Sequence, residues 1–182
     1  MKVRNKRETV ITDGKEYMII RVLKERSDQA LYQAMQNRKC FLIREFETKE
    51  GFEACIDAHE RLSRIGIKVP ELIACADDYN ICVEKYVTGT PIPELIMRGD
   101  LPEKFLVQIK DMAEKCESRE IVLDYYPTNY IVCGKTLVYT GCKYYERTEN
   151  NSYEKAGYSF WAKPAELIRC MANGEGNRSN EQ

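Results

Sequence analysis

The most informative segment of the chain is Ile121-Val122-Leu123-Asp124-Tyr125-Tyr126-Pro127-Thr128-Asn129-Tyr130-Ile131-Val132, followed by Lys135-Thr136-Leu137-Val138-Tyr139-Thr140-Gly141-Cys142. It holds an acidic residue, Asp124, then four intervening residues and an amide residue, Asn129. Two short apolar runs come next and are joined through Cys133-Gly134, where glycine tolerates the positive φ of a tight turn. This pattern predicts a polar loop followed directly by a pair of strands.

Short helices are expected before and after this stretch. Residues 88–91 form a turn-rich joint, and residues 92–97 predict a short helix that ends near Gly99. Residues 102–116 predict a second helix, with Pro102 suited to its first turn and a buried stripe made of Phe105, Leu106, Ile109, Met112 and Ala113. Residues 164–171 predict a last short helix, and the polar tail at 173–182 is expected to be disordered.

The first half of the chain reads mainly as strands. Runs at 8–11 and 17–23 flank the turn dipeptide Asp13-Gly14, and further runs lie at 30–35, 40–46, 72–75 and 81–87. Between them, residues 49–65 predict a helix whose apolar stripe recurs every three or four positions: Phe52, Cys55, Ile56, His59 and Leu62. Gly66 should end this helix. The half is expected to form a five-stranded antiparallel sheet with one helix packed on it.

In order and spacing these motifs resemble the protein-kinase-like superfamily, in particular small bacterial and atypical Ser/Thr kinases. Asp124 and Asn129 match its catalytic-loop acid and metal-binding amide. In Cys40-Phe41-Leu42-Ile43-Arg44 the arginine stands where the family has a phosphate-binding lysine, and residues 81–92 resemble the strand and hinge where adenine docks. The resemblance runs from about Tyr17 to Tyr145.

The resemblance implies an α+β, two-lobed fold, with residues 1–87 as the sheet lobe and residues 88–172 as a truncated, mainly helical lobe. It implies Asp124 as the catalytic residue and ATP as the cofactor. The cofactor-binding residues would be Arg44, Glu84, Tyr86 and Asn129, and Asn129 would also be the metal ligand.

Several positions depart from the family pattern. Residues 24–29 should form the glycine-rich phosphate loop but contain no glycine, so Cβ atoms obstruct the approach of the backbone to phosphates. The helix glutamate that positions the lysine falls near Cys55, which cannot form that ion pair. Thr140 stands where the family has a metal-binding aspartate, and Mg²⁺ prefers anionic oxygen ligands. We therefore expect a pseudokinase with a degraded Mg²⁺ site, acting as a noncatalytic binding or regulatory module.

Two alternatives stay open. The first is an active atypical phosphotransferase, acting on Ser/Thr or on a small molecule, with Asp124 as its base. The second is an unrelated α+β interaction protein, in which Asp124 accepts backbone N–H bonds before Pro127 and Asn129 stabilises the same turn.

Composition limits the partners. The 28 basic and 29 acidic side chains give no global field for nucleic acid, and no apolar run reaches the ~20 residues of a membrane span. A cytoplasmic protein is expected.

The eight cysteines include no C-x-x-C pair, which favours free buried thiols over a redox sensor or a disulfide framework. The late cluster of aromatic residues is expected to fill the small second core, although an exposed part of it would favour a homodimer, a protein partner or a small-molecule ligand.

Overall fold

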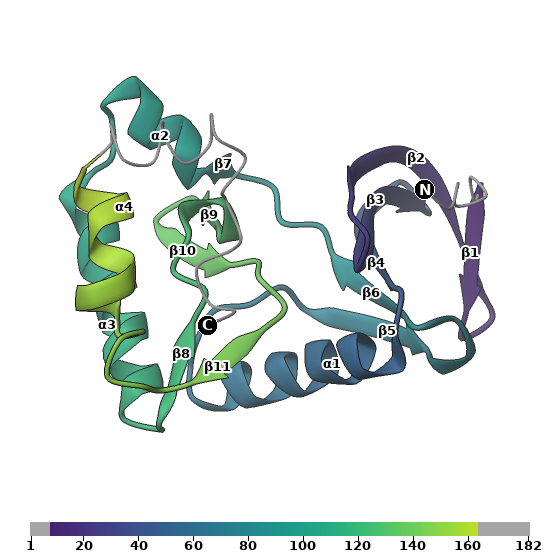
Figure 1. The fold of residues 1–182 in the computed structure, drawn as a ribbon. Helices are drawn as coiled ribbons and strands as arrows, with labels where there is room; N and C mark the ends of the chain where they lie inside the picture. The colour runs from purple at the N-terminus through teal and green to yellow at the C-terminus, as the bar shows by residue number, and fades with distance from the viewer. Residues whose placement is uncertain (1–7, 164–182) are drawn as a thin grey trace. The chain divides into compact units, whose positions relative to one another are not determined.

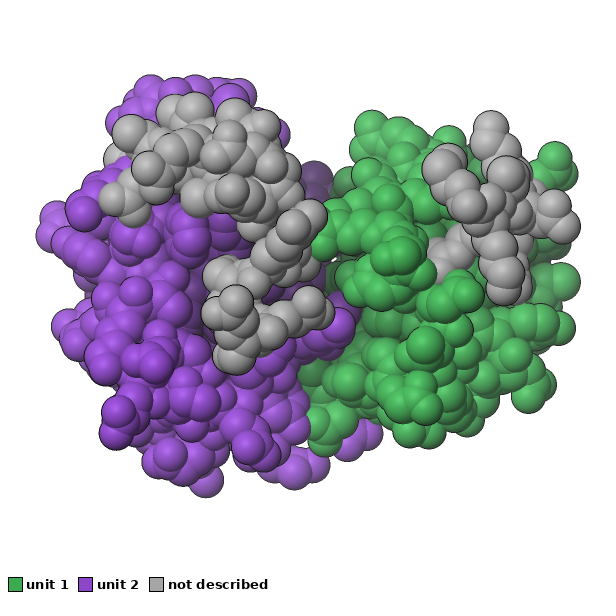
Figure 2. Space-filling view, viewed as in Figure 1, with its two compact units in different colours: residues 1–59, 70–86 green, residues 60–69, 87–182 purple. Residues whose placement is uncertain are grey.

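The computed structural model describes residues 8–163. The helix expected at 164–171 and the tail expected at 173–182 lie outside the described residues. The chain divides into two compact units (Figures 1 and 2): unit 1 runs to His59 and includes Pro70–Tyr86, and unit 2 contains Glu60–Val69 and the chain from Val87 onward.

Unit 1 is built on one antiparallel sheet with the strand order β1-β2-β3-β4-β6-β5. Its strands are β1 (Thr9–Thr12), β2 (Lys15–Glu25), β3 (Gln29–Gln36), β4 (Lys39–Phe46), β5 (Leu72–Ala76) and β6 (Ile81–Lys85). The expectation of five strands is wrong by one. The first run is a full member of the sheet, because it pairs with β2 along its whole length and buries Val10.

Two tight turns fix the register of this sheet. Asp13 and Gly14, between β1 and β2, have φ values of 51° and 69°. Asn37 and Arg38, between β3 and β4, have φ values of 47° and 63°. Two consecutive left-handed residues are typical of the type I′ turn, whose twist matches that of paired strands. The Asp-Gly signal was readable from sequence, whereas Arg38 adopts the same conformation without being glycine.

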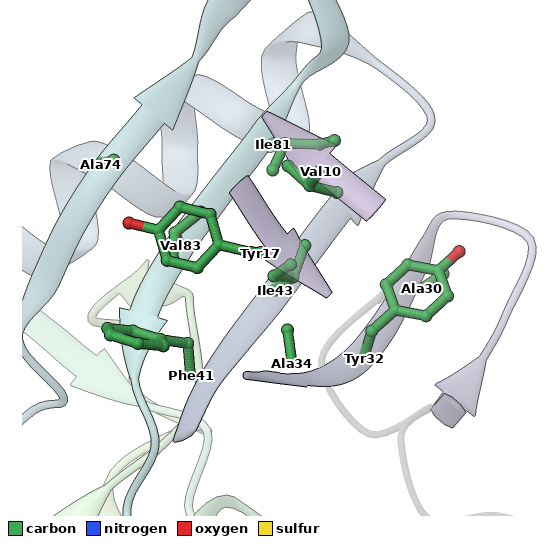
Figure 3. Close-up of a cluster of buried hydrophobic side chains, with 10 residues drawn as sticks. All are labelled: Val10, Tyr17, Ala30, Tyr32, Ala34, Phe41, Ile43, Ala74, Ile81 and Val83. Carbon is green, nitrogen blue, oxygen red and sulfur yellow. The ribbon is translucent and has the colours of Figure 1, made fainter. Parts of the chain in front are cut away.

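One face of the sheet holds an apolar cluster (Figure 3). Tyr17 packs edge-on against Phe41 with their ring centroids 5.1 Å apart, and both rings lie beside Ile43 and Val83. The sheet curls around this cluster and brings its two edge strands together. The Thr12 hydroxyl of edge strand β1 donates to the Cys75 carbonyl of edge strand β5 at 3.2 Å. Alternation along the strands turns Arg44 and Glu84 to the opposite face.

Helix α1 (Lys49–Arg64) supplies side chains to that opposite face through His59, and its buried stripe is Phe52, Cys55, Ala58, His59 and Leu62. The helix ends as the sequence predicts. Gly66 has a φ of 83°, and its N–H donates to the Ser63 carbonyl while the Ile67 N–H donates to the Leu62 carbonyl.

Unit 2 combines helices with two small sheets. The helices are α2 (Ile92–Arg98), α3 (Glu103–Glu117), a π-helical turn at Tyr153–Gly157 and α4 (Tyr158–Ala162). Strands β9 (Tyr130–Cys133) and β10 (Thr136–Tyr139) form the expected hairpin and continue to β7 (Thr90–Pro91), while β8 (Ile121–Leu123) pairs with β11 (Tyr144–Glu146). Within the described residues, no helix has both the length and the apolar character needed to span a bilayer.

Most of the aromatic residues of unit 2 lie in its core, as expected, whereas Tyr158 is exposed. Tyr130 lies 5.0 Å from Trp161 and 5.2 Å from Tyr139, measured between ring centroids. Trp161 is buried, and its indole N–H donates to the Tyr125 carbonyl at 2.8 Å. Gly157 fits against this cluster because a Cβ there would lie 2.7 Å from the Cβ of Tyr125. The rings therefore fix the short α4 segment on the strand and loop that carry Asp124.

Candidate functional site

The loop between β8 and β9 holds the first group of candidate residues. The Asp124 carboxylate accepts the Tyr126 backbone N–H at 3.1 Å, an interaction that closes a turn two residues long. The Asn129 side-chain amide donates back to the Asp124 carbonyl at 3.3 Å. Both side chains are half-buried. The structure thus brings Asp124 and Asn129 together, and both stabilise the loop in which they lie.

Thr140 joins the same loop from the end of β10. Its backbone N–H and its hydroxyl both donate to the Asn129 carbonyl, at 2.7 and 3.1 Å. The place expected for a metal-binding aspartate is therefore filled by a neutral hydroxyl that already has an acceptor within the protein. Between residues 124 and 145, Asp124 is the only residue with a carboxylate side chain. Magnesium prefers several hard oxygen ligands, and this loop offers one anionic side chain.

Tyr139 is the last residue of β10, directly before Thr140, and is fully buried. Its hydroxyl donates to the Lys143 carbonyl at 2.7 Å. Burial raises the pKa of this phenol well above its ordinary value, and the negative charge of Asp124 raises it further. Tyr139 is therefore a neutral hydrogen-bond donor that ties the end of β10 to the following turn.

The second group of candidates lies in unit 1. Arg44 on β4 and Glu84 on β6 are 4% and 0% exposed. The arginine Nε donates to Oε1 of the carboxylate at 2.5 Å, and Nη2 donates to Oε2 at 3.4 Å. Burial opposes the ionisation of Glu84, yet the Arg44 charge and the hydrogen bond from His59 together hold the pKa of this carboxyl below its usual value. The pair is an ionised, two-point ion pair inside the fold.

His59 of α1 completes this group. Its Nε2 lies 3.2 Å from Glu84 Oε1, while its buried Nδ1 has no hydrogen-bond partner among the described residues. Cys55 lies one helical turn earlier, so that thiol, imidazole and carboxylate offer ligand atoms within 4.8 Å of one another. Arg44 contacts both oxygens of the carboxylate, so a cation would have to displace the guanidinium. The donor set is therefore a poor fit for a metal ion while the ion pair is intact.

The ion-pair partner of Arg44 does not come from helix α1 but is the buried Glu84. Cys55 does occupy the helix position, and Glu53 and Asp57 are exposed. The carboxylate comes instead from the neighbouring strand, since Arg44 pairs in register with Cys82, two residues before Glu84. Tyr86, the remaining candidate, is half-buried just after β6, and its backbone N–H donates to the Cys40 carbonyl at 3.3 Å.

Sequence reasoning placed His59 on the buried stripe but gave it no role. The available signal was a single histidine on the buried face of a helix that packs on strands carrying Arg44 and Glu84.

The segment from 24 to 29 also differs from a phosphate loop in its path. It forms a short hairpin turn in which the Arg26 N–H donates to the Gln29 carbonyl at 2.9 Å.

Comparison with known proteins gives a likeness of fold. No family model and no curated protein matches the chain. Among solved structures, 465 chains match. One of them is the crystal structure of the BubR1 kinase domain, which has a TM-score of 0.58 and 12% sequence identity; the match covers 81% of this chain and 55% of that chain. The chain therefore has a kinase-like fold and spans about half the length of that kinase-domain chain.

Proposed function

We propose that this protein is a noncatalytic, kinase-like binding or regulatory module with a degraded ATP and Mg²⁺ site. The observation that carries the proposal is Thr140. A kinase needs an anionic ligand at this position to hold the metal that neutralises phosphate charge. Here a neutral hydroxyl donates to the Asn129 carbonyl instead.

The environment of Arg44 supports the same conclusion. Its guanidinium is buried and forms a two-point interaction with Glu84. Moving it to a phosphate would leave the buried Glu84 carboxylate without its main counter-charge, which is costly in a low-dielectric interior. Arg44 is therefore better suited to holding the sheet than to binding a nucleotide.

The retained loop favours one alternative, an active atypical phosphotransferase with Asp124 as its base. Asp124 is half-buried, and four residues separate it from Asn129, which is the spacing of the kinase catalytic loop. Its carboxylate can still accept a proton while one oxygen contacts the Tyr126 N–H. The kinase-like fold argues against the other alternative, an α+β interaction protein unrelated to kinases.

A thermal-shift experiment separates these functions. The protein is melted with ATP, ADP or GTP, each with Mg²⁺, with Mn²⁺ or with a chelator. A nucleotide at ~100 times its Kd should stabilise the fold by about 2.7 kcal/mol, so binding is readily detected. The matched control is Asp124→Asn, because the amide oxygen can still accept the Tyr126 N–H.

The proposal predicts that added metal produces no extra shift with any nucleotide. A shift of equal size with metal and with chelator is consistent with a nucleotide-binding module, and no shift at all with a scaffold that binds protein. A shift that needs Mg²⁺ and is lost in Asp124→Asn would overturn the proposal in favour of the phosphotransferase.

A further inference from the structure

Two cysteines face each other across the β5–β6 hairpin. Cys75 and Cys82 are register partners on these antiparallel strands. Directly opposed residues in such a pair have Cα atoms about 4.5–5.5 Å apart, which lies within the range that a disulfide requires. Because they are register partners, their side chains leave the hairpin on the same face. Both cysteines are free thiols in this structure.

The two thiols differ in accessibility. Cys82 is fully buried, whereas Cys75 is half-buried and can be reached by a small oxidant. Such an arrangement has one thiol that meets the reagent and a second, directly opposite it on the neighbouring strand, that can resolve the product. We propose that Cys75 and Cys82 form a redox modification site, in which a hydroperoxide converts the pair into a reversible cross-strand disulfide.

The chemistry is balanced in two steps. The Cys75 thiolate attacks the hydroperoxide, the O–O bond breaks, and Cys75 becomes a sulfenic acid while water or an alcohol leaves. The Cys82 sulfur then attacks the Cys75 sulfur, the S–O bond breaks, and hydroxide leaves and takes up the Cys82 proton as water. Two electrons pass from the two sulfurs to the peroxide, and a dithiol reductant reverses the change.

The surroundings of Cys75 set the rate. Burial raises the pKa of this thiol, and the charges of Asp77, Asp13 and Glu84 raise it further, although the neighbouring Cys82 thiol lowers it. Little thiolate is present near neutral pH, so oxidation should be slow at pH 7 and faster at pH 9.

The position of the pair links it to the ion pair described above. Cys82 is the register partner of Arg44 and precedes Glu84 by two residues, on the same face of β6. A disulfide at Cys82 would change the side-chain packing next to the buried charges. This link does not depend on whether the protein binds a nucleotide.

Mass spectrometry can test the site directly. The reduced 182-residue chain is treated with hydrogen peroxide at pH 7 and pH 9, blocked with N-ethylmaleimide and digested with trypsin. Cys75 and Cys82 fall in one tryptic peptide, residues 69–85. A disulfide makes this peptide lighter by two hydrogen atoms and prevents both alkylations. The control variant is Cys133→Ser, which removes the exposed cysteine of the described residues.

The expected result is that the oxidised peptide 69–85 becomes the main form, sooner at pH 9, in both wild type and Cys133→Ser, and that dithiothreitol restores both alkylations. Cys82→Ser should leave Cys75 as a sulfenic acid that dimedone traps. The proposal is overturned if Cys75 and Cys82 both remain alkylated while Cys133 is oxidised. It is equally overturned if Cys75 pairs with a different cysteine.

Discussion

Arg44, Glu84 and His59 show how a charged group can be built into an apolar interior. Glu84 is 0% exposed, yet both of its oxygens have donors, and His59 adds a third contact. Burying such a pair costs desolvation free energy. Removing one partner alone destabilises the fold strongly, because it leaves the other charge buried without a counter-charge. The structural role of the group therefore predicts a pattern of stability changes, which differs from that of a surface ion pair.

The first prediction concerns removal of one charge. Glu84→Gln should lower the free energy of unfolding by about 3–5 kcal/mol, because it leaves the Arg44 guanidinium buried without a counter-charge. The double variant Arg44→Met with Glu84→Leu should recover most of this loss, since both charges are then absent. Urea denaturation followed by circular dichroism measures both changes.

The control for this prediction is an exposed pair on α3. Lys115 contacts Asp111 at 2.7 Å, but both side chains are largely exposed. Lys115→Met should therefore change the free energy of unfolding by less than about 1 kcal/mol. Equal effects of Glu84→Gln and Lys115→Met would contradict a buried, structurally coupled ion pair.

The second prediction concerns pH. The pKa of Glu84 in the fold is lowered from its model-compound value of 4.5. Its ionised form is favoured by folding, so its contribution is fully present above about pH 4.5 and is lost as pH falls through the lower, folded pKa. The stability difference between wild type and Glu84→Gln should be constant from pH 7 to pH 5 and shrink below pH 4.5. Denaturant titrations at each pH measure it, and a difference that grows in acid would refute the assignment.

At the scale of elements, the β3–β4 turn offers a third prediction. Arg38 is exposed with a φ of 63°, in the turn position that usually carries glycine. The left-handed conformation costs an L-residue about 1–2 kcal/mol, and glycine at this position would remove that cost. Glycine also raises the entropy of the unfolded chain, which offsets part of the stabilisation. Arg38→Gly should therefore stabilise the fold by about 0.5–1 kcal/mol, measured by chemical denaturation.

Its control is the next residue along the chain. Lys39 begins β4 and does not have a positive φ. Lys39→Gly should destabilise the fold, because glycine in a strand adds entropy to the unfolded chain without relieving strain. If both substitutions shift the unfolding midpoint in the same direction, the turn does not have the conformation described.

Elements with a strong local signal could be predicted from the sequence, and those set by tertiary contacts could not. The helix from Lys49 to Arg64 follows from its apolar stripe and its terminal Gly66. Strand β7 has only two residues and depends on Gly89, where a Cβ would lie 2.1 Å from the Val132 carbonyl oxygen. The π-helical turn that precedes α4 depends on aromatic packing around Gly157. No local sequence pattern specifies these close contacts at Gly89 and Gly157.

At the scale of the whole molecule, the same distinction applies to the candidate site. The spacing of Asp124 and Asn129 was visible in sequence, and their joint loop could be expected from it. The pairing of Arg44 with Glu84 was not visible, because strand register and helix placement decide which side chains meet. His59 was likewise visible only as part of a buried stripe.

The likeness to a kinase domain extends over 81% of this chain but 55% of the other. A shared fold at 12% identity does not carry an activity with it. Function must therefore be judged from the side chains, and in the function we propose Thr140 is the residue that departs most from the needs of phosphoryl transfer. If the missing carboxylate costs about 10³-fold in rate, that equals about 4 kcal/mol of transition-state stabilisation.

The most direct test is a phosphoryl-transfer measurement on the purified 182-residue chain. The protein is incubated with γ-³²P-ATP and Mg²⁺ or Mn²⁺, with and without a general protein substrate, next to Asp124→Asn as the control. Our account predicts that wild type and Asp124→Asn release and transfer phosphate at the same background rate. Transfer by the wild type that requires metal and disappears in Asp124→Asn would contradict it.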